Sequence, residues 1–115
     1  MKQPVLSEKL ITKAVIGHWR ALGLPGTLVA AIPSMGAMGQ YGLTRGLPDL
    51  MVLGGGFLGD RVGFIELKTT KGRASPFQRD FADRCELLGI PYALTRGREQ
   101  PIAVLEEWQV VRAVA

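Results

Sequence analysis

The sequence contains few of the residues that build disulfide-linked or zinc-binding proteins. Of its 115 residues, one is cysteine (Cys85) and one is histidine (His18). A single cysteine excludes an internal disulfide and a cysteine-rich zinc site, and a single histidine excludes a metal site built from several histidines. Both residues lie on apolar stripes of expected helices. We therefore interpret Cys85 as core and His18 as a packed or partly exposed residue.

Long apolar runs are also absent, and the charge is moderate. No run approaches the roughly 20 apolar residues needed to cross a bilayer, and the first residues lack the apolar centre of a signal peptide. We expect a cytoplasmic protein without membrane association, folded as a single domain over residues 1–115. The composition is 47% apolar and 21% charged, as in ordinary folded domains. A net charge of +4 permits a nucleic-acid partner but does not require one.

Hydrophobic spacing predicts an α/β fold with the element order α-β-β-β-α-β-α, a single mixed β-sheet flanked by helices. The expected elements are a helix over residues 7–22, strands over Thr27–Ile32, Leu50–Leu53 and Val62–Leu67, a helix that starts at Ser75 and closes at Gly89, a strand over Tyr92–Thr95 and a helix over Leu105–Val114. The glycine-rich residues 34–46 are expected to form a mobile loop. The expected buried stripes are Leu10, Ile11, Ala14, Val15, His18 and Leu22 in the first helix and Phe77, Phe81, Cys85 and Leu88 in the second.

The second and third strands flank a turn with four glycines, a pattern typical of a β-hairpin. If the hairpin closes about Phe57 and Leu58, Leu53 faces Val62, Met51 faces Phe64, and Asp49 faces Glu66. Two carboxylates would then lie about 5 Å apart on neighbouring strands, which is unfavourable without a counter-charge. Lys68 follows Glu66 by two residues, so its side chain leaves the same face of the strand.

Each of these residues has an ordinary structural explanation when it is considered alone. Asp49 follows Pro48, a pair common in turns, and Glu66 with Lys68 could be an exposed ion pair at a strand end. Together they favour a site, because Glu66 interrupts an otherwise buried strand and an unpaired buried carboxylate is costly. Asp and Glu oxygens suit Mg²⁺ or Mn²⁺, and a bound cation activates water and offsets charge on phosphate oxygens. Lys68 could orient that water or stabilise the transition state. The set predicts phosphodiester hydrolysis.

The motifs around these residues resemble a known family. The runs R-G-L-P-D-L (45–50) and I-E-L-K-T-T-K-G-R-A-S-P-F-Q (65–78) resemble the PD-(D/E)xK nucleases and, within them, the virus-type replication-repair nuclease branch, VRR-NUC. The resemblance implies a Mg²⁺- or Mn²⁺-dependent endonuclease that cuts branched or flapped DNA in replication, repair or recombination. It implies Asp49, Glu66 and the main-chain carbonyl of Leu67 as metal ligands, Lys68 as the catalytic lysine, and Gln78 beside them. The chain is similar to the stand-alone phage and bacterial members, which resemble Holliday junction resolvases and form homodimers.

Several further assignments stay open at this level. Gln78 also fits a capping box with Ser75, a role that competes for the same side chain. Glu8 is a candidate additional metal ligand from the first helix, and the alternative is a first-turn acid that favours the helix dipole. The candidate DNA contacts are Arg45, Lys71, Arg73 and Arg79, each of which could instead be a solvated charge. Trp19 and Trp108 are either packing or dimer residues. The alternative function is a catalytically silent DNA-binding or assembly module that keeps the nuclease fold.

Overall fold

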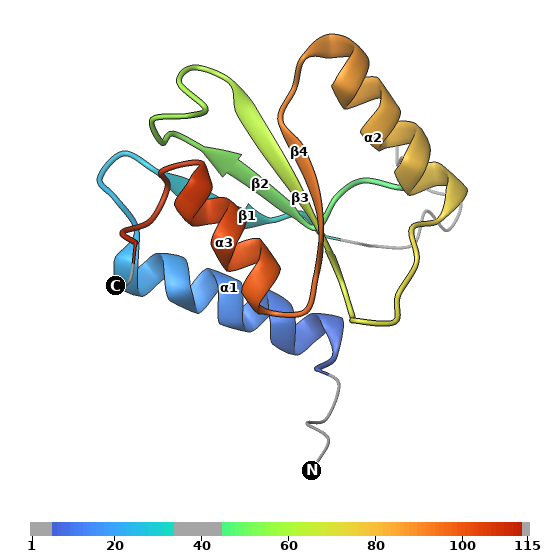
Figure 1. The fold of residues 1–115 in the computed structure, drawn as a ribbon, viewed down its shortest axis with the longest axis horizontal. Helices are drawn as coiled ribbons and strands as arrows, with labels where there is room; N and C mark the ends of the chain where they lie inside the picture. Colours follow the sequence, from blue (N-terminus) through green and yellow to red (C-terminus); the bar gives the residue numbers. More distant parts are fainter. Residues whose placement is uncertain (1–5, 34–44, 114–115) are drawn as a thin grey trace.

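The structure is a computed structural model that describes residues 6–33 and 45–113. Across these residues the predicted fold class is confirmed, because the elements follow the order α-β-β-β-α-β-α and build a mixed four-stranded sheet with strand order β1-β2-β3-β4. The elements are α1 (Glu8–Leu22), β1 (Leu28–Ala31), β2 (Leu50–Leu53), β3 (Val62–Lys68), α2 (Pro76–Leu88), β4 (Tyr92–Arg96) and α3 (Glu99–Glu107). Figure 1 shows α1 and α3 next to each other, with α2 beside β4 and apart from them.

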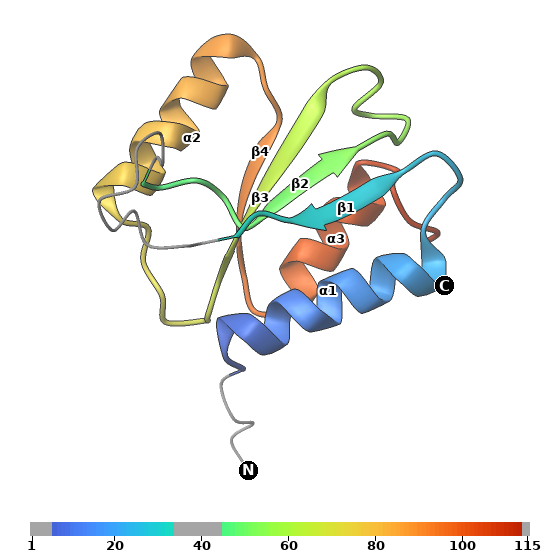
Figure 2. The same ribbon diagram turned by 180° about the vertical axis from the view of Figure 1, so that it is seen from behind.

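The strands pair in the register that the sequence predicts. β2 and β3 are antiparallel, with Leu53 opposite Val62 and Met51 opposite Phe64. β1 is antiparallel to β2, whereas β3 and β4 are parallel because α2 connects them. This register gives the sheet two distinct faces, since side chains alternate along each strand. Figure 2 shows the sheet from the side opposite to Figure 1.

One face of the sheet carries the main hydrophobic core. Val52, Ile65 and Leu67 point to this face and are buried. They pack with Ile11 and Val15 of α1 and with residues of α3. Ser7 caps α1 by accepting a hydrogen bond from the Leu10 amide at 3.2 Å. The predicted α1 stripe is wrong at Leu10, whose exposed fraction is 51%, because it lies one helical position to the side of Ile11.

α2 covers part of the opposite face. The Phe81 ring packs edge-on against Phe64 of β3, with the ring centroids 5.3 Å apart, and Cys85 is buried as predicted. Phe77 and Leu88 were expected in the same buried stripe but are 52% and 64% exposed. The stripe is wrong at its two ends because the aromatic side chains of the sheet contact the middle turns of the helix.

The last helix differs from its prediction. It spans Glu99–Glu107 and not Leu105–Val114. Gln109 takes a left-handed backbone conformation (φ 61°), and the Val110 amide bonds to the Leu105 carbonyl at 2.9 Å, a closure that ends a helix. The valines that follow are buried, and Val111 pairs with Gly23 in an isolated bridge. Their apolar spacing therefore reflects core packing outside the helix.

Both tryptophans contribute to packing within the chain. Trp108 is buried in the core cluster, and the Trp19 indole donates a hydrogen bond to the Thr27 hydroxyl at 3.0 Å. His18 is half-buried on α1, as expected. Most of the predicted loop over residues 34–46 falls on residues 34–44, which lie outside the described residues. None of the described helices combines the length and the apolar character needed to span a membrane.

Candidate active site

β3 carries two charged residues into the sheet face that α2 partly covers. Glu66 and Lys68 alternate with the core residues Ile65 and Leu67, so their side chains leave the opposite face. Glu66 is 1% exposed and Lys68 is 8% exposed. Charged side chains are almost never this buried unless they are paired. Glu66 and Lys68 therefore need polar partners at the end of β3.

Asp49 reaches this place from the residue just before β2. The pairing of Leu50 with Ile65 is the last of the β2–β3 ladder, and extending it by one residue sets Asp49 against Glu66. One Asp49 carboxylate oxygen, Oδ2, accepts a hydrogen bond from the Leu67 amide at 2.7 Å, so the side chain continues the ladder where β2 has ended. In a strand the N–H and C=O of one residue point to the same edge. The Leu67 carbonyl thus faces the Asp49 side.

Within residues 6–33 and 45–113, the Glu66 carboxylate has partners on one of its two oxygens. Its Oε2 lies 3.5 Å from the Lys68 ammonium and accepts a hydrogen bond from the Gln78 amide at 3.2 Å. Its Oε1 is buried and has no hydrogen-bond partner among the described residues. Burial, and after it the neighbouring Asp49 carboxylate, raise the pKa of Glu66 to about 8, while Lys68 acts in the opposite direction. A cation at Oε1 would compensate both unfavourable effects.

Gln78 performs the two roles that had seemed to compete. Its side-chain oxygen accepts a hydrogen bond from the main-chain amide of Ser75 at 2.9 Å, while the Ser75 hydroxyl accepts one from the main-chain amide of Gln78 at 3.2 Å. This is a complete capping box at the start of α2. The side-chain nitrogen of the same amide group donates to Glu66. The helix cap therefore fixes the amide group in the orientation that contacts the carboxylate.

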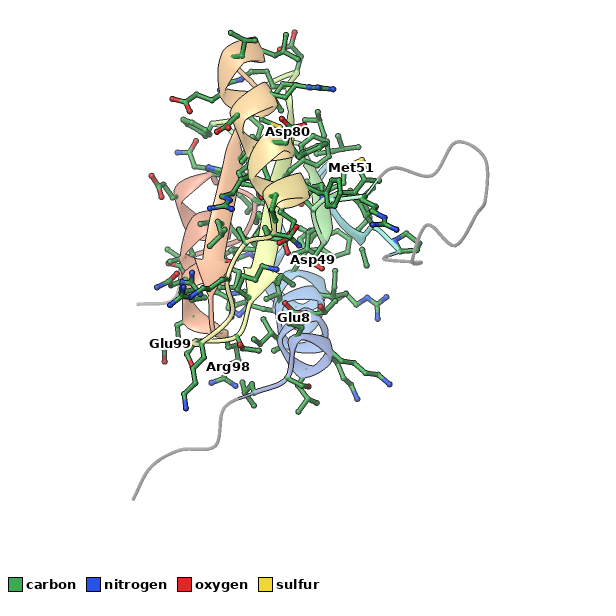
Figure 3. All side chains as sticks on the ribbon, turned by 90° about the vertical axis from the view of Figure 1, so that its right-hand side faces the viewer. Glu8, Asp49, Met51, Asp80, Arg98 and Glu99 are labelled. Carbon is green, nitrogen blue, oxygen red and sulfur yellow. The ribbon has the colours of Figure 1, made fainter. Side chains whose placement is uncertain are left out.

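Glu8 lies at the border of this cluster. Its Oε1 is 3.9 Å from the Lys68 ammonium, and its side chain is 52% exposed. Figure 3 shows Glu8 at the start of α1 below Asp49, near the end of the sheet. Over residues 6–33 and 45–113, no three acidic, histidine or cysteine side chains are grouped as a metal site would require. The structure thus brings Glu8 to Lys68, whereas Asp49 and Glu66 form the inner pair of carboxylates.

The four basic residues expected to contact DNA are all exposed. Lys71 and Arg73 lie in the turn after β3, and Arg79 lies in the first turns of α2. The Arg45 guanidinium lies over the Phe77 ring, with its central carbon 5.6 Å from the ring centroid. None of the four forms an ion pair with the site carboxylates among the described contacts.

Comparison with known proteins places the chain in a recognised fold. A solved structure described as a VRR_NUC domain protein superposes with a TM-score of 0.76 and 19% identity, over 91% of this chain and 89% of that chain. The chain has the fold of a VRR-NUC domain. A second solved VRR_NUC domain superposes with a TM-score of 0.64 and 22% identity, over 88% of this chain and 96% of the other. No family model and no curated protein matches the sequence.

Two residues of β4 that contact the site end of β3 were missed in the sequence. The Thr95 hydroxyl donates to the Glu66 main-chain carbonyl at 2.9 Å, and Arg96 pairs with Lys68 in the parallel β3–β4 ladder. The Arg96 guanidinium also donates to the Gly72 carbonyl in the turn after β3. No local spacing relates β4 to β3, because parallel strands are joined through a helix and their register depends on tertiary packing.

Proposed function

We propose that the chain is a VRR-NUC nuclease domain that hydrolyses phosphodiester bonds of DNA with the help of Mg²⁺ or Mn²⁺. The observation that carries this proposal is the convergence of Asp49, Glu66, Lys68 and Gln78 at the end of β3, where one Glu66 oxygen is buried without a partner. A core built for stability alone would contain apolar residues at these positions, because replacing buried charges by packed apolar groups is often neutral or stabilising.

The donor set fits a hard divalent cation. Asp49 and Glu66 would hold the ion, and the Leu67 carbonyl, which faces the Asp49 side, is the expected third ligand. With Glu8 included, the cluster carries three carboxylates against the single ammonium of Lys68. When all three are ionised they repel a phosphate and attract a cation, and a bound cation in turn favours the ionised form of Glu66. When bound, the cation supplies a Lewis acid that offsets charge on the phosphate and makes water more acidic.

The protein side chains have distinct tasks in this proposal. Lys68 is held by Glu66 and Glu8, and its ammonium can orient the attacking water or stabilise negative charge that develops on the phosphate. Gln78 holds Oε2 of Glu66, which leaves Oε1 for the cation. The Asp49 carboxylate is fixed by the Leu67 amide. Each group is thus positioned by hydrogen bonds or ion pairs before substrate binds, which lowers the cost of reorganisation.

The proposed substrate is branched DNA, of the Holliday junction or flap type. The exposed Arg45, Lys71, Arg73 and Arg79 supply positive charge around the cluster for backbone phosphates, an affinity that depends on salt and not on sequence. We also propose a homodimer, in which two-fold symmetry lets two sites address paired strands. A cytoplasmic location, in a bacterium or a phage-infected cell, follows from the same assignment.

The test is a cleavage assay with labelled junction, flap and linear duplex DNA in the presence of Mg²⁺. We expect cleavage by the wild type and its loss in Asp49→Ala and Lys68→Ala. The matched controls are Asp80→Ala and Lys13→Ala, which remove an exposed acid and an exposed lysine elsewhere on the chain. If either site variant cuts as fast as the controls, the assignment is wrong.

A silent DNA-binding module is the second candidate, and one observation favours it. Within the described residues the inner carboxylates number two, and Lys68 is engaged by both Glu66 and Glu8. Thermal unfolding with Mn²⁺ separates the two candidates. A rise in melting temperature that disappears in Glu66→Ala supports the enzyme, and no rise at any Mn²⁺ concentration supports the module.

A further inference from the structure

The first turn of α2 exposes an aromatic side chain beside the candidate active site. Phe77 directly precedes Gln78, whose side-chain amide contacts Glu66, yet Phe77 is 52% exposed. A single exposed apolar residue needs no explanation by itself. Here the ring is combined with a cation over its face and with a backbone that fixes both groups. This combination carries the inference.

The cation is Arg45, held over the ring by an unusual turn. The guanidinium carbon lies 5.6 Å from the centroid of Phe77, within the range of a cation–π contact. Gly46 follows with a positive φ of 85°, and a Cβ added there would come within 2.5 Å of the Phe77 backbone. Only glycine therefore allows the chain to approach the start of α2 this closely. The turn fixes Arg45 and Phe77 against each other.

The same two segments carry residues of the site. Arg45 precedes Asp49 by four residues, so the two lie at most about 14 Å apart along the chain. Phe77 is the neighbour of Gln78 in the first turn of α2. A nucleic-acid strand rises about 3.4 Å per stacked nucleotide. A phosphate at Asp49 and Glu66 would therefore have bases within a few nucleotides of Phe77.

We propose that Phe77 and Arg45 form a platform that stacks an unpaired base of the nucleic-acid strand held at the site. An aromatic ring and a guanidinium plane are the two protein surfaces on which unstacked bases are commonly placed. Bases inside a duplex stack on each other and expose no face to such a platform. The platform thus selects a strand that leaves the duplex with its bases unpaired, as at a flap. This inference rests on the proposed function.

Binding of fluorescently labelled DNA with Ca²⁺ in place of Mg²⁺ tests the platform, because Ca²⁺ neutralises the carboxylates but lacks the strict octahedral coordination that the proposed reaction uses. The two probes are a blunt duplex and the same duplex with a single-stranded extension. We expect Phe77→Ala to weaken binding of the extended probe about tenfold, as loss of one stacked base does, and to leave the blunt duplex within twofold. Phe77→Trp should retain the affinity. Leu87→Ala removes an 84% exposed apolar residue from the other end of α2 and serves as the control.

Abasic DNA provides a second measurement, in which the stacked group is removed from the DNA and not from the protein. Extensions that lack bases but retain phosphates should bind the wild type about as weakly as Phe77→Ala binds the normal extension, and Phe77→Ala should lose nothing further. Three results would overturn the platform: an equal loss of affinity of Phe77→Ala for the blunt and the extended duplex, full affinity of Phe77→Leu for the extended duplex, or an unchanged affinity of Phe77→Ala for it. If no DNA binds or is cut at all, the proposed function fails. If DNA is cut and Phe77→Ala binds normally, this inference alone fails.

Discussion

Replacing Glu66 by glutamine should stabilise the metal-free protein at neutral pH. The Glu66 side chain is 2% exposed, its Oε1 has no partner in the described part of the chain, and Asp49 lies next to it. An amide in the same place carries no charge, and its nitrogen can donate to the Asp49 carboxylate. At neutral pH a carboxyl with a pKa of about 8 is largely protonated in the folded chain and ionised in the unfolded chain, so folding carries the cost of proton uptake, which a neutral amide avoids.

The magnitude follows from the pKa of Glu66, which rises from 4.5 to about 8 because of burial and the Asp49 carboxylate. Below pH 4.5 the carboxyl is protonated in both the folded and the unfolded state, so the shift does not affect stability. Between pH 4.5 and 8 the unfolded chain ionises first, and the unfolding free energy falls by about 1.4 kcal/mol per pH unit. At neutral pH this loss is about 3 kcal/mol. We expect the substitution to recover about 1–2 kcal/mol, since Lys68 loses one partner.

The assay is urea or thermal unfolding in EDTA, near pH 4.5 and near pH 8. Near pH 8 the variant should melt about 4–8 °C above the wild type, and near pH 4.5 the difference should vanish. Glu107→Gln, at an exposed position of α3, should match the wild type at both pH values. The reasoning would be refuted if the variant melted below the wild type near pH 8, or if it melted above the wild type by the same amount at both pH values.

Three further substitutions test contacts around the site. Arg96→Lys keeps the charge but loses the guanidinium bond to the Gly72 carbonyl, so it should lower the unfolding free energy by about 1 kcal/mol and speed amide exchange in the turn after β3. Ser75→Ala should cost about 1 kcal/mol through the lost cap, and it should slow cleavage as much as Gln78→Ala does if the cap orients Gln78. Tyr92→Phe removes a buried hydroxyl without a partner among the described residues and should raise the unfolding free energy by about 1 kcal/mol in urea unfolding.

Much of the fold could be predicted because its signals are local. Ser7 and Ser75 mark the starts of α1 and α2, and Gly89 closes α2 in a left-handed conformation. The β2–β3 register was also accessible, since a short connection and the alternation of apolar residues fix it. The end of α3 was not, because it depends on Gln109, a residue type that rarely takes a positive φ. The spacing of apolar residues alone could not distinguish the buried Val110 and Val111 from the apolar stripe of a helix.

The candidate site divides in the same way. Asp49, Glu66 and Lys68 were related through the hairpin, whose register is local. Gln78 was found by resemblance, and its double contact could not be foreseen, because one amide serves the helix cap with its oxygen and Glu66 with its nitrogen. Arg96 was missed because its position beside Lys68 depends on the parallel ladder, which forms after a helical crossover and leaves no periodic signal in the sequence.

The burial of Glu66 and Lys68 is not explained by the stability of β3. Every residue from Ile65 to Lys68 is buried, and an apolar pair at positions 66 and 68 would pack against the same neighbours at lower cost. The surrounding contacts compensate only part of this cost: Lys68 and Gln78 satisfy Oε2 of Glu66, and Oε1 remains without a partner among the described residues. Natural proteins depart from the most stable choice mainly at functional sites. The residual cost at Glu66 is therefore the feature that supports the proposed cation site, in which the buried Oε1 would be a ligand.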